Sequence, residues 1–180
     1  GRKTLRRLGA GMWQADMGRF DANPDALPAV GLGSGPLVHA DLVAAGRSWD
    51  VACVSMGNPH CIVEWPDLDT LPTGAALAAI GPDFEKHPAF PEGTNTEFVY
   101  VRDPHHLVMR VWERGSGETM ACGTGACATV AAMVLRGVCP RGEAVQVELL
   151  GGTLSITIDA DDAVQMAGPA ETAFVGRVEV

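Results

Sequence analysis

The chain has 180 residues, a length suited to one domain or to two small ones. Hydrophobic residues make up 47% and charged residues 19%, which is enough apolar material for a core and excludes a disordered chain. A formal net charge of -9 argues against nucleic acid as the main partner, because a phosphate backbone repels an acidic surface. The apolar runs are shorter than the roughly 18 residues that cross a bilayer, so no membrane partner is expected.

The five cysteines lie at positions 53, 61, 122, 127 and 139. Their odd number and the absence of a C-x-x-C pair argue against a disulfide framework and against a metal site. A reducing compartment, the cytoplasm, is therefore expected. The basic start at 1–7 has no apolar stretch behind it, which argues against a secretory signal. Because the chain does not begin with Met, we expect it to begin inside a longer protein.

Twenty-two Gly and twelve Pro favour many turns and short strands. Strands are predicted within 8–20, 36–41, 49–55, 61–65, 97–102, 107–112, 145–150, 153–159, 163–166 and 173–180. Hairpin turns are predicted at Gly46, at 103–106 and at 151–152. Residues 21–36 hold three Pro and three Gly, which predicts a connector and a possible domain boundary.

Two helices interrupt the predicted strands. Residues 73–80 are small and Ala-rich, and the helix they predict ends before Gly81 and Pro82. Residues 124–135 are apolar almost all round, so this second helix is expected at the centre of its domain. Strands around one buried helix indicate an α+β fold.

The densest candidate site is the segment 113–125, which connects a predicted strand to the buried helix. Cys122 precedes the helix, where the helix dipole and unpaired N–H groups would stabilise a thiolate. Gly123, Thr124 and Gly125 leave backbone N–H groups open to a carboxylate. The alternative is that Cys122 is one more small buried hydrophobic residue.

Four other residues are candidates for substrate contacts. Arg114 offers a planar fork for a carboxylate, although Glu113 and Arg114 could equally form a solvated pair. Asn58 carries an amide suited to an amino-acid head group. His60 could move a proton or be a structural histidine, and Asn95 could merely form an Asx-turn.

Three motifs, GNPHC at 57–61, FPEGTN at 90–95 and ERGSGETMACGTGACA at 113–128, closely resemble diaminopimelate epimerase. The resemblance covers nearly the whole chain. It implies a curled, mostly antiparallel sheet around a central buried helix. It also implies an isomerase of lysine and peptidoglycan biosynthesis that interconverts LL- and meso-diaminopimelate without a cofactor. In that family two cysteines face each other across the substrate α-carbon, and each moves a proton on its own side.

Carried over by motif, Cys122 resembles the second catalytic cysteine. The residues similar to the family's substrate contacts are Asn58, Asn95, Glu113 and Arg114, and the backbone of Gly123 and Thr124 resembles its cradle for the α-carboxylate. His60 and Glu113 resemble the groups that adjust the acidity of the two thiols. The family's first catalytic cysteine, in an Asn-Gly-x-x-Cys-type motif, has no counterpart here. We therefore interpret the remaining four cysteines as structural.

The resemblance also implies a division of the chain. Residues 1–18 would be the last strands of a missing amino-terminal domain, 19–163 the carboxy-terminal domain, and 164–180 strands that return to the missing half. Strand edges exposed in this way would invite pairing. The partners implied are that missing domain, the substrate diaminopimelate and a second copy in a homodimer.

Three alternatives stay open. Gly123, Gly125 and Ala128 could form a dinucleotide fingerprint with Glu148, although ten residues separate the strand from these glycines. The chain taken alone could be a non-catalytic substrate-binding half. It could also belong to a sister family of the same fold, such as proline racemase or the phenazine-pathway isomerase.

Overall fold

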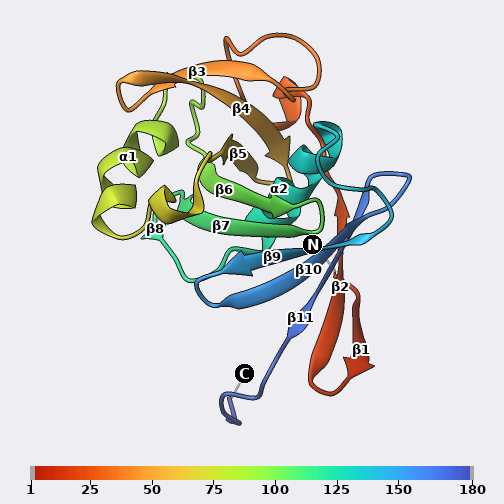
Figure 1. Cartoon of the computed structure of the whole chain (residues 1–180). Coiled ribbons are helices and arrows are strands. Elements are labelled where there is room, and N and C mark those ends of the chain that lie inside the picture. The colour runs from red at the N-terminus through yellow and green to blue at the C-terminus, as the bar shows by residue number, and fades with distance from the viewer. Residues whose placement is uncertain (1–2, 179–180) are drawn as a thin grey trace.

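The computed structural model describes residues 3–178, and in that range all the named strands belong to one mixed sheet (Figure 1). Its strands are β1 (Leu5–Gly9), β2 (Met12–Arg19), β3 (Ala40–Ala44), β4 (Arg47–Ser55), β5 (Pro59–Glu64), β6 (Asn95–Asp103), β7 (His106–Glu113), β8 (Gly117–Glu118), β9 (Ala144–Leu149), β10 (Gly152–Ile158) and β11 (Ala163–Pro169). The helices are α1 (Ala75–Glu85) and α2 (Gly123–Leu135), with short 3₁₀ turns η1 (Pro24–Ala26) and η2 (Leu68–Thr70).

The strand order is β1-β2-β11-β10-β9-β7-β6-β5-β4-β3, with β8 paired to β7. Neighbouring strands run antiparallel except at β5–β6 and β7–β9. The helix α2 contacts β4, β5 and β6 on one side and β10 and β11 on the other, so the sheet curls around it. The predicted α+β fold, a mostly antiparallel sheet around a buried helix, is confirmed.

The first of two hydrophobic clusters lies between α2 and the sheet. All nine residues from Gly125 to Met133 are buried, as predicted for a helix apolar on every side. Most of them are small, which lets the helix approach strands on two sides. Arg136 ends the helix, and its nearly buried guanidinium donates to the carbonyl of Val38 at 3.0 Å and pairs with Asp50 at 3.1 Å.

The second cluster covers the opposite face of β4, β5 and β6, beneath α1. Phe84 of α1 packs edge-on against Phe98 and Trp49, with ring centroids 5.3 and 5.5 Å apart. Cys53 and Cys61 face each other across β4 and β5 within this cluster. As predicted, these two cysteines lie in strands, Cys127 lies inside α2 and Cys139 follows that helix. All five cysteines are free and buried.

The helix predicted over 73–80 was wrong at its end, because α1 continues through Gly81 and Pro82 to Glu85. Leu77, Gly81 and Phe84 are buried on one side of α1, and this packing holds the helix across the proline. Gly81 allows close contact, since a Cβ there would lie 2.5 Å from Cγ of Trp112.

Two strand predictions and one turn prediction need correction. The strand predicted at 36–41 begins only at Ala40, and the turn predicted at 151–152 lies one residue earlier. Residues 173–178 form no strand, because they find no partner edge. Phe174 and Val175 are 86% and 91% exposed there. The last two residues of that predicted strand lie outside the described residues.

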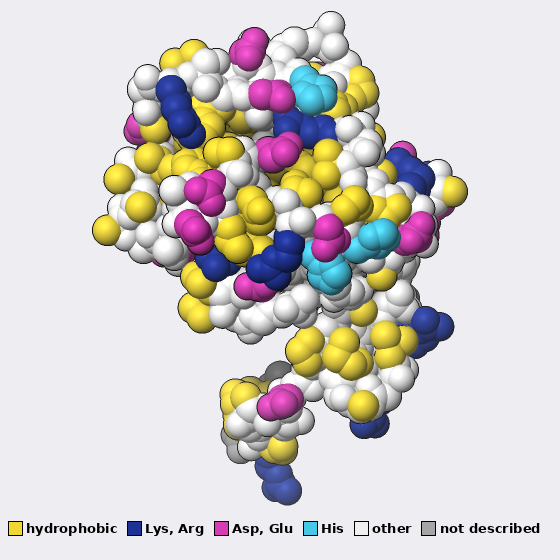
Figure 2. Space-filling view, viewed as in Figure 1, with side chains coloured by type: hydrophobic (Ala, Val, Ile, Leu, Met, Phe, Trp, Pro, Cys, Tyr) yellow, Lys and Arg dark blue, Asp and Glu magenta, His cyan; other side chains and the backbone are white. Residues whose placement is uncertain are grey.

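Strands β1 and β2 and the end of β11 project from the body of the molecule (Figure 1). β1 is exposed along its whole length and forms one edge of the sheet. Figure 2 shows apolar side chains on this projection, and Leu5, Leu8 and Trp13 are among the exposed large hydrophobic residues. Within residues 3–178, neither helix has the length and apolar character needed to span a membrane.

Candidate active site at the start of the buried helix

The loop from β7 to α2 is held by both ends of α1. Glu118 accepts hydrogen bonds from the backbone N–H of Gly74, at the start of α1, and from the hydroxyl of Thr73, each at 2.7 Å. At the other end, Glu85 accepts from the N–H of Gly115 at 2.9 Å and from the indole of Trp112 at 2.7 Å. These bonds fix the loop that carries Glu113 and Cys122.

Cys122 is the N-cap of α2, as its place before the helix predicts. Its Sγ accepts a hydrogen bond from the N–H of Gly125 at 3.3 Å and lies 3.6 Å from the hydroxyl of Thr124. The side chain thus takes the capping position that Ser or Asp usually fills. With 7% of its surface exposed, the thiol sits at the mouth of the helix and is largely shielded from solvent.

The acidity of this thiol differs from the prediction of a stabilised thiolate. Burial, followed by the charge of Glu97, raises the pKa of Cys122 from 9.0 to about 11. The hydrogen bonds of Thr124 and Gly125 act in the opposite direction but are weaker, and Glu113 adds to the increase. In this chain Cys122 is therefore a thiol at neutral pH.

Backbone donors and a side-chain amide converge beside the thiol. The first N–H groups of a helix have no partner within the helix. Cys122 takes that of Gly125, and those of Gly123 and Thr124 find no acceptor in the described part of the chain. Asn58 reaches the same place, with its Nδ2 3.4 Å from Oγ1 of Thr124. The structure thus brings together four of the predicted site residues.

Beneath this first turn lies a buried, hydrogen-bonded pair of a histidine and a glutamate, of which sequence analysis found only one member. His60 Nδ1 and Glu97 Oε1 are 2.7 Å apart, and both side chains are fully buried. His60 is thus adjacent to the site, as predicted, whereas Glu97 was missed. The signal for it is an acidic residue two positions after Asn95, which places both on one face of a strand.

The remaining predicted residues lie where β6 begins and where β7 ends. Asn95 forms no Asx-turn, because its amide donates to the carbonyl of Pro59 and its oxygen accepts from the N–H of Arg114, each at 2.9 Å. The guanidinium of Arg114 is exposed and donates to the carbonyl of Glu92 at 3.0 Å. Glu113 instead accepts a hydrogen bond from the hydroxyl of Thr119, so the predicted alternative of a Glu113–Arg114 pair is not seen within residues 3–178.

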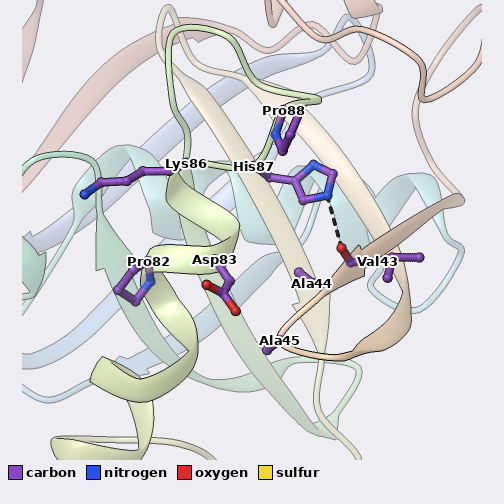
Figure 3. A pocket seen from close by; sticks show the side chains of 8 residues that line it. All are labelled: Val43, Ala44, Ala45, Pro82, Asp83, Lys86, His87 and Pro88. Atoms are coloured by element: carbon purple, nitrogen blue, oxygen red, sulfur yellow. Dashed lines mark hydrogen bonds between the residues drawn. The ribbon is translucent and has the colours of Figure 1, made fainter.

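A separate depression of about 450 Å³ lies between the β3–β4 turn and the end of α1 (Figure 3). His87 Nε2 donates to the carbonyl of Val43 at 3.1 Å, and its Nδ1 accepts from the N–H of Ala89 at 3.1 Å. The imidazole therefore has a structural role. None of the predicted site residues lines this depression, and residues 3–178 contain no cluster of three or more His, Cys, Asp or Glu arranged for a metal.

The dinucleotide alternative is not supported by the surroundings of its glycines. A Cβ at Gly125 would lie 2.5 Å from Oε1 of Glu97, so this glycine faces a carboxylate where a pyrophosphate would need open backbone. Glu148, the proposed ribose contact, forms an exposed ion pair with Arg102 at 3.4 Å.

Comparison with known proteins decides the family. The family model described as diaminopimelate epimerase matches residues 52–173. This chain belongs to the diaminopimelate epimerase family. Diaminopimelate epimerase of Synechococcus elongatus is 49% identical over 171 residues, which are 94% of this chain and 59% of that protein. That of Leptospira biflexa is 42% identical over 169 residues, 94% of this chain and 58% of that protein. The chain thus spans less than two thirds of these diaminopimelate epimerases.

Solved structures with the same fold come from related racemases and epimerases. A probable proline racemase from Agrobacterium radiobacter K84 superposes with a TM-score of 0.64 at 14% identity, covering 99% of this chain and 56% of that one. A hydroxyproline epimerase from Agrobacterium vitis gives 0.61 at 15% identity, covering 93% and 57%. At these identities the likeness shows the shared fold of the diaminopimelate epimerase family and these enzymes.

Proposed function

We propose that this chain is the carboxy-terminal, substrate-binding part of an enzyme that interconverts LL- and meso-diaminopimelate. The observation that carries the proposal is Cys122 at the mouth of α2, beside two open backbone N–H groups and the amide of Asn58. This arrangement offers one proton-carrying group and one anion cradle within a single helical turn. Its sequence lies within the segment that matches the diaminopimelate epimerase model.

The reaction requires removal of a weakly acidic α-proton and return of a proton on the opposite face. A thiolate outside this chain would take the proton from the α-carbon and leave a carbanion. Cys122 would then give its S–H proton to the other face, so that the C–H bond forms as the S–H bond breaks. A pKa of about 11 supports this starting state, because Cys122 then carries the proton that it must donate. In the reverse direction the Cys122 thiolate would be the base.

The remaining residues have proposed roles around the α-carbon. The N–H groups of Gly123 and Thr124 would bind the α-carboxylate, where the positive end of the helix dipole also stabilises the developing charge. The exposed guanidinium of Arg114 would pair with the substrate's distal carboxylate. Asn58, Asn95 and Glu113 would bind the amino groups, and His60 and Glu113 would adjust the acidity of the two thiols.

We also propose the division that the family resemblance implies. Residues 1–18 and 164–180 would pair with the first domain, and 19–163 would form the second. The exposed apolar side chains of Leu5, Leu8 and Trp13 support this, because a further domain would cover them. A homodimer and a cytoplasmic location are part of the same proposal, and sedimentation of the intact protein would test the dimer.

The test uses this chain alone with meso-diaminopimelate in D2O. We expect chemical-shift changes at the Gly123 and Thr124 amides without multiple-turnover epimerisation, because the second thiol is supplied from outside residues 1–180. trans-4-Hydroxyproline is the comparison ligand, and it should not shift these amides to the same extent. Sustained epimerisation by this chain would show that both acid-base groups lie within it, whereas unshifted amides would refute the carboxylate cradle.

A further inference from the structure

A buried carboxylate lies behind the candidate catalytic thiol. Glu97 is on the sheet face that α2 covers, together with His60 on the neighbouring parallel strand. Both side chains are fully buried, and the Nδ1 to Oε1 distance of 2.7 Å is that of a charge-assisted hydrogen bond. An ionised carboxylate in such a place is costly unless neighbouring groups stabilise it, so its surroundings indicate what it does.

The carboxylate and the thiol flank the same glycine. A Cβ at Gly125 would lie 2.5 Å from Oε1 of Glu97 and 3.1 Å from Sγ of Cys122. The two groups are therefore neighbours, because both lie against the same residue in the first turn of α2. The positive end of the helix dipole reaches both, and it stabilises negative charge on whichever of them carries it.

Two atoms of the His60 and Glu97 side chains have no partner. In the described part of the chain, Nε2 of His60 and Oε2 of Glu97 are buried without a hydrogen bond. An ionised carboxylate can only accept, so a hydrogen bond from Nδ1 to Glu97 would set which nitrogen of His60 carries the proton and leave Nε2 without a partner. Such unpaired polar atoms are rare inside proteins and are typical of groups that act on a ligand or a proton.

We propose that Glu97 is a positioning residue of the Cys122 site: it fixes which nitrogen of His60 carries a proton and holds negative charge directly behind the thiol. This inference rests on the proposed function and extends it to a residue with no assigned role. Glu97 would act through His60 and Cys122 and would not touch the substrate. Its charge would keep Cys122 protonated between turnovers, which is the state needed for proton donation.

The first test needs no substrate and uses Glu97→Gln in this chain. The substitution keeps the size and a hydrogen-bond acceptor but removes the charge. We expect alkylation of Cys122 by iodoacetamide at pH 8.5, followed by peptide mass spectrometry, to become about threefold to tenfold faster, as for a fall of half to one unit in its pKa. The titratable groups around this thiol are Glu97, Glu113, His60 and Cys127.

Glu148→Gln is the matched control, because Glu148 has the same side chain in an exposed ion pair and should leave the alkylation rate unchanged. The second readout is the nitrogen NMR spectrum of the His60 ring. We expect Glu97→Gln to change the populations of its protonated nitrogens and Glu148→Gln to leave them as they are. Circular dichroism establishes that each variant is folded, and Glu97→Met, which also removes the charge at a similar size, replaces Glu97→Gln if the latter is not.

Unchanged alkylation and an unchanged His60 spectrum in a folded Glu97 variant would overturn the proposal. In the intact epimerase, we expect Glu97→Gln to lower kcat and to shift its pH profile while KM stays the same. A rise in KM alone would show that Glu97 contacts substrate and would also overturn it. Because the thiol and imidazole measurements need no diaminopimelate, their outcome is independent of whether the proposed function fails.

Discussion

A methyl group at Gly81 would collide with Trp112, where α1 packs against β7. An alanine Cβ would lie 2.5 Å from Cγ and 2.8 Å from Cε3 of this rigid ring, against about 3.5 to 4.0 Å for carbon atoms in contact. Helix α1 or the ring must therefore move by about 1 Å. Overpacking of this kind costs about 1 to 3 kcal/mol, and the better helix propensity of alanine returns about 1 kcal/mol. We expect Gly81→Ala to lower the free energy of unfolding by about 1 kcal/mol.

Urea denaturation followed by far-UV circular dichroism measures this change. The decisive comparison is the same substitution in a Trp112→Ala background, where the obstacle is gone and Gly81→Ala should stabilise the chain by about 1 kcal/mol. Ala79→Gly, at an exposed position of the same helix, measures the difference in helix propensity between alanine and glycine without a packing effect. A stabilising Gly81→Ala in the parent chain, or the same sign in both backgrounds, would refute the reasoning from close packing.

Three further predictions concern the core and its ionisable groups. Burial raises the pKa of Cys127 from 9.0 to about 12, so the folded state holds this proton more tightly than the unfolded state. This thiol should therefore make stability fall as pH rises above about 9, by up to about 1.4 kcal/mol per pH unit beyond the fall due to the other buried thiols, and a Cys127→Ala variant that falls as steeply as the parent chain would contradict this. Met133→Ala should lower the free energy of unfolding by about 2 to 5 kcal/mol, because Met133 is fully buried, whereas the exposed Met120→Ala should change it by less than about 0.5 kcal/mol. Arg136→Met should lower the free energy of unfolding by about 1 to 3 kcal/mol, because the carbonyl of Val38 and the carboxylate of Asp50 lose their donor. The surface substitution Arg102→Met should lower it by less than about 1 kcal/mol. Equal urea midpoints for the two variants would show that the Arg136 contacts contribute nothing.

Local sequence signals account for much of the fold. The apolar run at 124–135 predicted α2 to within one residue at its start, and the turn at Gly46 predicted the β3–β4 hairpin, because both depend on neighbouring residues. The end of α1 could not be predicted in this way. It depends on packing between Gly81 and Trp112, which are distant in sequence. The tail at 173–178 has strand-forming residues, but whether they form a strand depends on a partner edge.

The candidate site, like the fold, could be predicted from the sequence only in part. The place of Cys122 before a helix was evident from its glycine-rich surroundings, and the structure confirms that position. The raised pKa was not evident, because burial and the approach of Glu97 follow from the register between β5 and β6 and from how α2 lies on them. For the same reason Glu97 itself was missed: only the assembled sheet shows that it stands beside His60.

The central claim is that Cys122 moves the proton on one face of the substrate α-carbon. The most direct measurement is exchange of the α-hydrogen of diaminopimelate in D2O by the intact epimerase that contains this chain, with Cys122→Ala and Cys122→Ser. The control is Cys139→Ala, which changes a buried thiol after the end of α2. We predict that both Cys122 variants fold but lose epimerisation and the α-hydrogen exchange that accompanies it. The Cys139 variant should keep both activities. Exchange and epimerisation at the parent rate in a folded Cys122→Ala variant would contradict the assignment.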